Sequence, residues 1–117
     1  MASLPLLDSE DLAELNVALI THFHLDHCGA VPYLVASTGF KGHIFMTHAT
    51  KSIFHTMMKD MLRMHKGNPQ RQLFTAAQLD KTMQRISVIN FHQTIEADGV
   101  RITPYRCASL MYWRACR

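Results

Sequence analysis

Four side chains that could bind a metal ion lie close together near the start of the chain: His22, His24, Asp26 and His27. Imidazole nitrogens and carboxylate oxygens are ligands of zinc and of its neighbours in the first transition row. A metal ion held in this way lowers the pKa of a bound water, which then acts as the nucleophile of a hydrolase. The pattern therefore predicts a hydrolytic metal centre, with a solvated histidine-rich loop as the alternative.

An apolar run, residues 17–20, directly precedes these side chains and must position them. A run of this kind predicts a short buried strand. His22 and His24 are two positions apart, so in an extended segment their side chains point to the same side. Asp26 and His27 follow beyond the strand end, where a turn can direct them toward a second ion. We therefore expect two metal ions close together, with a water between them.

Three segments resemble a known family. Residues 21–27 resemble the signature T-H-x-H-x-D-H of the metallo-β-lactamase superfamily. Residues 26–34, D-H-C-G-A-V-P-Y-L, and residues 40–53, F-K-G-H-I-F-M-T-H-A-T-K-S-I, resemble its β-CASP branch, which contains the endonuclease subunit of the cleavage and polyadenylation specificity factor. The resemblance runs from about residue 4 to about residue 105. It implies an α/β fold that is an incomplete piece of the four-layer αββα sandwich of this superfamily.

The resemblance also implies an activity: a zinc-dependent endonuclease that hydrolyses a phosphodiester of precursor messenger RNA during 3′-end processing. Such an enzyme would work in the nucleus with other subunits of a cleavage and polyadenylation complex. His22 and His24 would hold one zinc ion, and Asp26 and His27 the second. Asp26 would also be catalytic, because it orients the nucleophile in the resembling family. No substrate-binding residue is assigned.

Two other interpretations stay open. The chain could belong to another hydrolase of the same fold, acting on a thioester or on DNA, although the segment at 40–53 argues against this. It could also be a pseudoenzyme fragment without catalytic activity, which contributes a binding surface to a processing complex.

The resemblance stops after Tyr105. The family continues with a segment like A-G-H-x-x-G-A, whose histidine completes the first metal site, and later supplies a bridging aspartate and another histidine. Residues 106–117 contain no histidine, glycine or aspartate. We therefore divide the chain into a partial domain, residues 1–105, and a tail of frameshift or mis-splice origin, residues 106–117. Strands that open the domain in the family are also expected to be missing.

The number of ligands has a chemical consequence. Two protein ligands are available for each ion, whereas a catalytic zinc ion has three. Too few ligands would leave the nucleophile poorly positioned, and a misplacement of about 1 Å can cost roughly a hundredfold in rate. We therefore expect the chain by itself to be inactive.

The composition fits one small domain. The chain has 117 residues, a formal net charge of +3 and eight histidines, and its mild basicity is compatible with an RNA partner. Its three cysteines, Cys28, Cys107 and Cys116, form no C-x-x-C pair, which argues against a secreted disulfide framework. Neither a signal peptide nor a membrane-spanning stretch is recognisable, so we expect a protein that is not secreted.

Periodicity and turn residues predict the order of elements. We expect helical structure at residues 8–15, 29–38, 50–64 and 75–85, and strands at residues 16–20, 42–46, 87–91, 93–97 and 100–103. Thr75 and Gln78 have capping-box spacing, and Asp98-Gly99 predicts a hairpin turn. The methionine-rich apolar stripe of residues 50–64 is expected in the core.

Three further residues need an interpretation. Cys28 is next to His27, and we expect it to be structural rather than a ligand. His48 is expected at the start of a helix near the site, either as part of it or with a local hydrogen bond. His92 falls in a strand region and is left outside the site.

Overall fold

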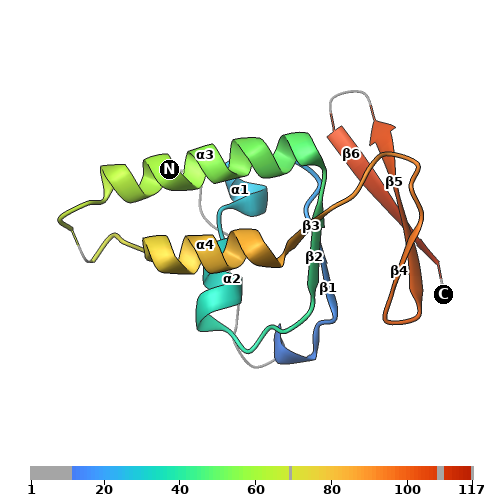
Figure 1. Ribbon diagram of the computed structural model, residues 1–117, viewed down its shortest axis with the longest axis horizontal. Coiled ribbons are helices and arrows are strands. Elements are labelled where there is room, and N and C mark those ends of the chain that lie inside the picture. Colours follow the sequence, from blue (N-terminus) through green and yellow to red (C-terminus); the bar gives the residue numbers. More distant parts are fainter. Residues whose placement is uncertain (1–11, 69, 108–109, 117) are drawn as a thin grey trace.

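A computed structural model describes residues 12–68, 70–107 and 110–116, the last of these by their backbone only. In chain order the elements are a 3₁₀ turn η1 (Leu12–Glu14), β1 (Val17–Leu19), α1 (Leu25–Cys28), α2 (Val31–Ser37), β2 (His43–Met46), α3 (His48–Met64), α4 (Ala76–Arg85), β3 (Ile86–Val88), β4 (Ile95–Ala97), β5 (Val100–Cys107) and β6 (Leu110–Cys116). They form three layers: the helices, a first sheet and a second sheet (Figure 1).

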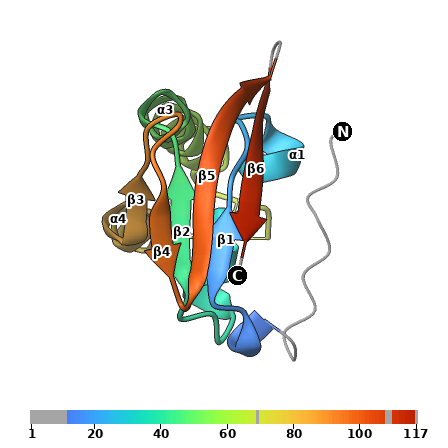
Figure 2. The same ribbon diagram turned by 90° about the vertical axis from the view of Figure 1, so that its right-hand side faces the viewer.

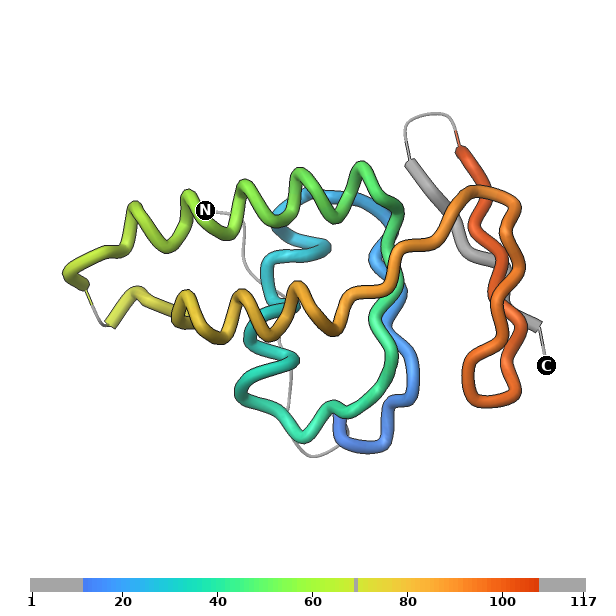
Figure 3. The backbone as a smooth tube through the Cα atoms, in the orientation of Figure 1, coloured from blue at the N-terminus to red at the C-terminus, as the bar shows by residue number. Residues whose placement is uncertain are grey.

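The first sheet is parallel and has the strand order β1-β2-β3. Val17 pairs with His43, and Ile44 pairs with Ile86. In a parallel sheet all strands end at the same edge, so the residues after β1, β2 and β3 come together there. The loop after β1, the start of α3 and the turn between β3 and β4 indeed lie toward the same end of the sheet (Figure 3).

One glycine lets the chain enter β2 close to β1. A Cβ atom at Gly42 would lie 2.3 Å from the carbonyl oxygen of Asn16, so no side chain fits there. The next residue, His43, donates its N–H to that same oxygen at 2.8 Å. Gly42 thus sets the register between the two strands.

The helices cover one face of the first sheet and form the larger core (Figure 1). The apolar stripe of α3 is part of this core, as predicted: Phe54 and Met58 are fully buried, with Met57, Met61 and Leu62 partly buried around them. Ile53 lies at the margin and is 38% exposed. The burial of this stripe explains why α3 is stable as a long helix.

Both long helices have capped N-termini. Thr47 caps α3, because its side chain accepts a hydrogen bond from the N–H of Thr50. Thr75 and Gln78 form the predicted capping box at the start of α4. These caps satisfy backbone donors that otherwise have no partner within the helix.

The second sheet is antiparallel, with the order β4-β5-β6. It packs on the face of the first sheet that the helices leave open, around a smaller core of Phe45, Ile89, Ala97 and Ile102 (Figure 2). The β4–β5 hairpin turns at Asp98 and Gly99, which both have positive φ values, 50° and 74°, as predicted from this dipeptide. The chain is therefore an α/β structure with three of the four layers of an αββα sandwich among the residues described.

Some element bounds differ from the prediction. The helix expected at residues 29–38 is the shorter α2, and a separate short helix, α1, precedes it where only a turn was expected. The strand expected at 87–91 ends at Val88, so that Phe91 lies in a turn, and β5 extends past residue 103 to Cys107. The helical structure expected at 8–15 is observed at Leu12–Glu14, and its first residues lie outside the described part. No helix of the described part is long and apolar enough to cross a membrane.

Candidate metal centre

The four predicted ligands lie in the loop after β1 and in α1. The ladder of the first sheet continues one residue past β1, because Ile20 donates its N–H to the carbonyl of Phe45 at 3.0 Å. The chain then runs through residues 21–24 without regular structure. His24 is the N-cap residue of α1, with φ −61° and ψ 142°. The buried end of the strand thus fixes the start of the loop, and α1 fixes its end.

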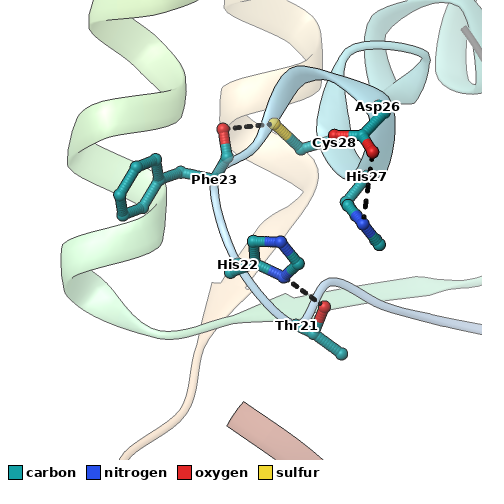
Figure 4. A network of polar contacts seen from close by, with 6 residues as sticks. All are labelled: Thr21, His22, Phe23, Asp26, His27 and Cys28. Atoms are coloured by element: carbon teal, nitrogen blue, oxygen red, sulfur yellow. Dashed lines mark hydrogen bonds and ion pairs between the residues drawn. The ribbon is translucent and has the colours of Figure 1, made fainter. Parts of the chain in front are cut away.

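The imidazole rings of His24 and His27 both lie against that of His22. Its ring centroid is 4.5 Å from that of His24 and 4.2 Å from that of His27. His22 and His24 therefore lie side by side, as predicted for two residues of an extended segment. The imidazoles of His22 and His27 lie inside the curve of the loop, whereas the ring of Phe23 points away from it (Figure 4).

His27 reaches this cluster because α1 turns the chain back. The carbonyl of His24 accepts hydrogen bonds from the N–H groups of His27 and Cys28, at 2.9 and 3.0 Å. Asp26 lies in the first turn of this helix, where a negative charge is favourable. Its Oδ2 is 3.5 Å from Nε2 of His27. Both residues are exposed, so this contact adds little to stability.

The surroundings of His22 keep its imidazole neutral. Burial lowers the pKa of His22, the neighbouring His27 and His24 lower it further, and the carboxylate of Asp26 opposes them. On the other side of the ring, Nδ1 lies 2.8 Å from the hydroxyl oxygen of Thr21. A neutral imidazole is the form that binds a metal ion.

Cys28 is part of the support of the loop. Its side chain is fully buried, and its thiol donates a hydrogen bond to the carbonyl of Phe23 at 3.3 Å (Figure 4). Burial, with a smaller contribution from Asp26, raises the pKa of Cys28 to about 11. A thiol that stays protonated is a poor ligand, which agrees with the structural role expected for it.

The donor types fit a transition metal, but their number is short. In the described part of the chain, no group of three or more histidine, cysteine, aspartate or glutamate side chains is arranged to hold a metal ion. His48, the first residue of α3, and His92, in the turn after β3, lie at the same edge of the sheet and are exposed. The described residues therefore lack a complete set of ligands for a metal ion.

One partner in the site was not assigned from the sequence. Thr21 stands in the quoted signature, but only the structure brings its hydroxyl to Nδ1 of His22. A threonine directly before the first histidine was the only signal available for this contact.

Comparisons with known proteins bear on these residues. Residues 2–105 match the sequence model of the metallo-beta-lactamase superfamily. The chain is 40% identical over 111 residues to "Cleavage and polyadenylation specificity factor subunit 3-I" of Arabidopsis thaliana, and 42% identical over 105 residues to "Cleavage and polyadenylation specificity factor 73" of Drosophila melanogaster. It is 38% identical over 112 residues to "Endoribonuclease YSH1" of Yarrowia lipolytica. These alignments cover 95%, 90% and 95% of the chain but only 16%, 15% and 14% of those proteins.

Proposed function

Because this chain belongs to the metallo-beta-lactamase superfamily, we propose that it carries part of the metal centre of an endonuclease that cuts precursor messenger RNA at its 3′ end. The histidine cluster around His22 is the observation that carries this proposal, since it lies where a parallel sheet ends and its imidazoles are of a type that binds metal ions. The identity of 38–42% to cleavage factors and endoribonucleases supports the reaction class.

In this proposal the superfamily's metal ions are two zinc ions. His22 and His24 bind one, and Asp26 and His27 bind the other. Bound zinc ions supply Lewis acidity and a water activated for attack on a phosphodiester. The carboxylate of Asp26 would orient that water. The hydroxyl oxygen of Thr21 lies 2.8 Å from Nδ1 of His22, and with a proton on Nδ1 the other ring nitrogen, Nε2, would be free to bind the metal.

The chain alone does not cut RNA in this proposal. Each ion has two protein ligands, and the described residues contain no larger group that could hold a metal ion. By itself the chain behaves as a non-catalytic fragment, and activity requires ligands from outside the described residues. Its partners are the precursor messenger RNA and other subunits of a nuclear cleavage and polyadenylation complex.

We also propose that residues 106–117 originate from a changed reading frame or an altered splice. The match to the family model ends at residue 105, which supports this origin, although the alignments to the Arabidopsis and Yarrowia relatives cover 95% of the chain and therefore extend beyond that residue. The backbone nevertheless continues β5 to Cys107 and pairs it with β6. Sequencing of the transcript tests the origin: an A-G-H continuation in the frame of residue 105 is expected, and a transcript that encodes residues 106–117 would contradict it.

A chimera tests the main proposal. Residues 2–105 of this chain replace the matching segment of the Drosophila relative, and the product is assayed for cleavage of a precursor messenger RNA. We expect cleavage, and we expect it to be lost with His22→Ala and with Asp26→Asn. His43→Ala is the matched control, since His43 is exposed and lies at the start of β2, away from the edge of the sheet where the histidine cluster lies.

Two outcomes would contradict the proposal. One is a folded chimera without cleavage activity. The other is a chimera whose activity is unaffected by His22→Ala, because the cluster would then have no part in the reaction.

A further inference from the structure

We propose that Phe91 and Arg106 form a stacking platform for a base of single-stranded RNA, at the edge of the sheet where the histidine cluster lies. This inference rests on the proposed function and adds a binding site to it; Phe91 lies in the part that matches the family, and Arg106 is taken as it stands in the 117-residue chain, whatever reading frame encodes residues 106–117. An exposed phenylalanine alone would carry no such argument, because single exposed apolar residues are common. Three features of the turn after β3 distinguish this one.

The first feature is a rigid turn. Asn90 accepts a hydrogen bond from the N–H of Gln93 at 3.1 Å, and the side-chain oxygen of Gln93 accepts one from the N–H of Asn90 at 3.0 Å. His92 donates its N–H to the carbonyl of Pro104 at 2.8 Å, which ties the turn to a fully buried residue of β5. Phe91 is therefore held in place by its neighbours on both sides.

The second feature is the strained conformation of His92. Its φ is 64°, in the left-handed region that residues other than glycine rarely adopt. Such conformations persist only where the surroundings impose them, and they are frequent at binding sites. The ring next to this strained residue faces outward, because Phe91 is 37% exposed although Ile89, two residues earlier, is fully buried.

The third feature is the charge beside the ring. The guanidinium carbon of Arg106 lies 5.4 Å from the centroid of Phe91. Arg106 is exposed, so its planar group is available to a ligand as well as to the ring. An aromatic ring and a guanidinium plane are the two groups on which unpaired RNA bases stack, and arginine also binds phosphate.

The platform lies at the same edge of the first sheet as the histidine cluster. It follows β3, and the cluster follows β1, with β2 between them. Two strand spacings are about 10 Å, a distance that a short oligonucleotide can span. In the first turn of α3, the ammonium group of Lys51 donates to the carbonyl of Ile86, the first residue of β3, at 2.9 Å. A chain of RNA along this edge would meet the base site and the candidate metal ligands.

The test measures RNA binding by the full 117-residue chain in the presence of a chelator, so that metal binding plays no part. The probe is a short fluorescent single-stranded RNA of mixed sequence, followed by anisotropy. We expect Phe91→Ala to weaken binding by about 10-fold, the loss of one stacked base, and Phe91→Trp to keep it. Leu73→Ala is the control, since Leu73 is 46% exposed in the distant loop before α4.

Arg106 is tested by the dependence of affinity on salt. Arg106→Ala should lower the slope of log K against log salt by about one, whereas Phe91→Ala should leave it unchanged. Arg101→Ala is the matched control, because Arg101 is exposed near the other end of β5. Circular dichroism confirms that each variant keeps the fold.

Three results would overturn the inference. The unchanged chain could fail to bind RNA, as expected of a surface that contacts a protein. Phe91→Ala and Leu73→Ala could bind the RNA equally well, or the chain could bind duplex RNA as tightly as single-stranded RNA. The two proposals fail separately. If RNA binding depends on Phe91 but the chimera does not cut RNA, only the proposed function is contradicted. If the chimera cuts RNA but Phe91→Ala leaves RNA binding unchanged, only the stacking platform is contradicted.

Discussion

Nδ1 of His22 lies 2.8 Å from the hydroxyl oxygen of Thr21, the residue directly before it. The contact fixes the orientation of the one imidazole that touches both other rings of the cluster. In metal sites, a hydrogen bond of this kind selects which ring nitrogen faces the ion. Thr21 is therefore a positioning residue for the candidate metal centre.

Thr21→Val removes this hydrogen bond and keeps the shape of the side chain. We expect the affinity for zinc to fall by about 10-fold or more, the usual size of such an effect, with little change in stability. A zinc titration by calorimetry checks this. Thr94→Val is the control, since it removes a comparable 2.8 Å contact with Thr103 away from the cluster. Equal zinc affinity in both variants would show that Thr21 has no such role.

His22 gives the stability a dependence on pH. Its pKa in the folded chain is lowered from 6.5, chiefly by burial and then by His27 and His24, so the unfolded chain takes up the proton more readily. Above pH 6.5, His22 is neutral in both states and does not reduce the free energy of unfolding. As the pH falls from 6.5 toward the lowered pKa, the unfolded chain takes up the proton first and the folded chain loses stability. We expect His22→Gln to reduce the loss of stability between pH 7.5 and pH 5.5. Urea unfolding at both values measures it.

The control for this pH effect is His43→Gln, at an exposed position of the opposite end of the sheet. The interpretation requires that His22→Gln flattens the pH dependence more than this control does. Identical profiles for the two variants would mean that His22 titrates alike in the folded and unfolded chains.

Cys28 and Cys107 should differ in reactivity. Cys28 is fully buried and its pKa is raised to about 11, whereas Cys107 is exposed. Because the thiolate is the reactive form, we expect iodoacetamide at pH 8 to label Cys107 and to leave Cys28 unmodified until urea unfolds the chain. Peptide mass spectrometry measures both sites in one sample. Equal labelling rates in the folded chain would contradict the packing described for the loop.

Two neighbouring residues of α3 should differ in their effect on stability. Phe54 is fully buried in the larger core, and Ile53 is 38% exposed at its margin. Phe54→Ala should destabilise the chain by about 3–5 kcal/mol, because it leaves a cavity. Ile53→Ala should cost less than about 1 kcal/mol. Urea unfolding of the two variants compares them, and similar losses would mean that the apolar stripe is not the core-facing side of α3.

Much of this architecture followed from local sequence patterns. The stripe around Phe54, the capping box of Thr75 and the hairpin at Asp98-Gly99 each act within a few residues, so the sequence predicts them directly. The position of the cluster also followed, because the strand before His22 fixes which edge of the sheet it reaches, although β1 is only partly buried and not fully buried as predicted. The metal ligands themselves remain predictions.

Other features depend on contacts that local patterns do not contain. Helix α1 has only four residues, too few to display a period, yet it determines that His27 reaches His22. The strand that ends at Val88 and the strand that begins at Ile95 looked alike in sequence. They belong to two different sheets, because Ile86–Val88 pairs with β2 and Ile95–Ala97 pairs with β5. Such pairing is set by the whole fold rather than by the strand itself.

The zinc content of the purified chain, measured by mass spectrometry after dialysis against a weak chelator, tests the central claim most directly. The account predicts far less than one zinc ion per chain, because His22 and His24, and Asp26 and His27, supply only two ligands to each ion. A content near two zinc ions per chain would contradict it, since ligands beyond these four would then complete the site.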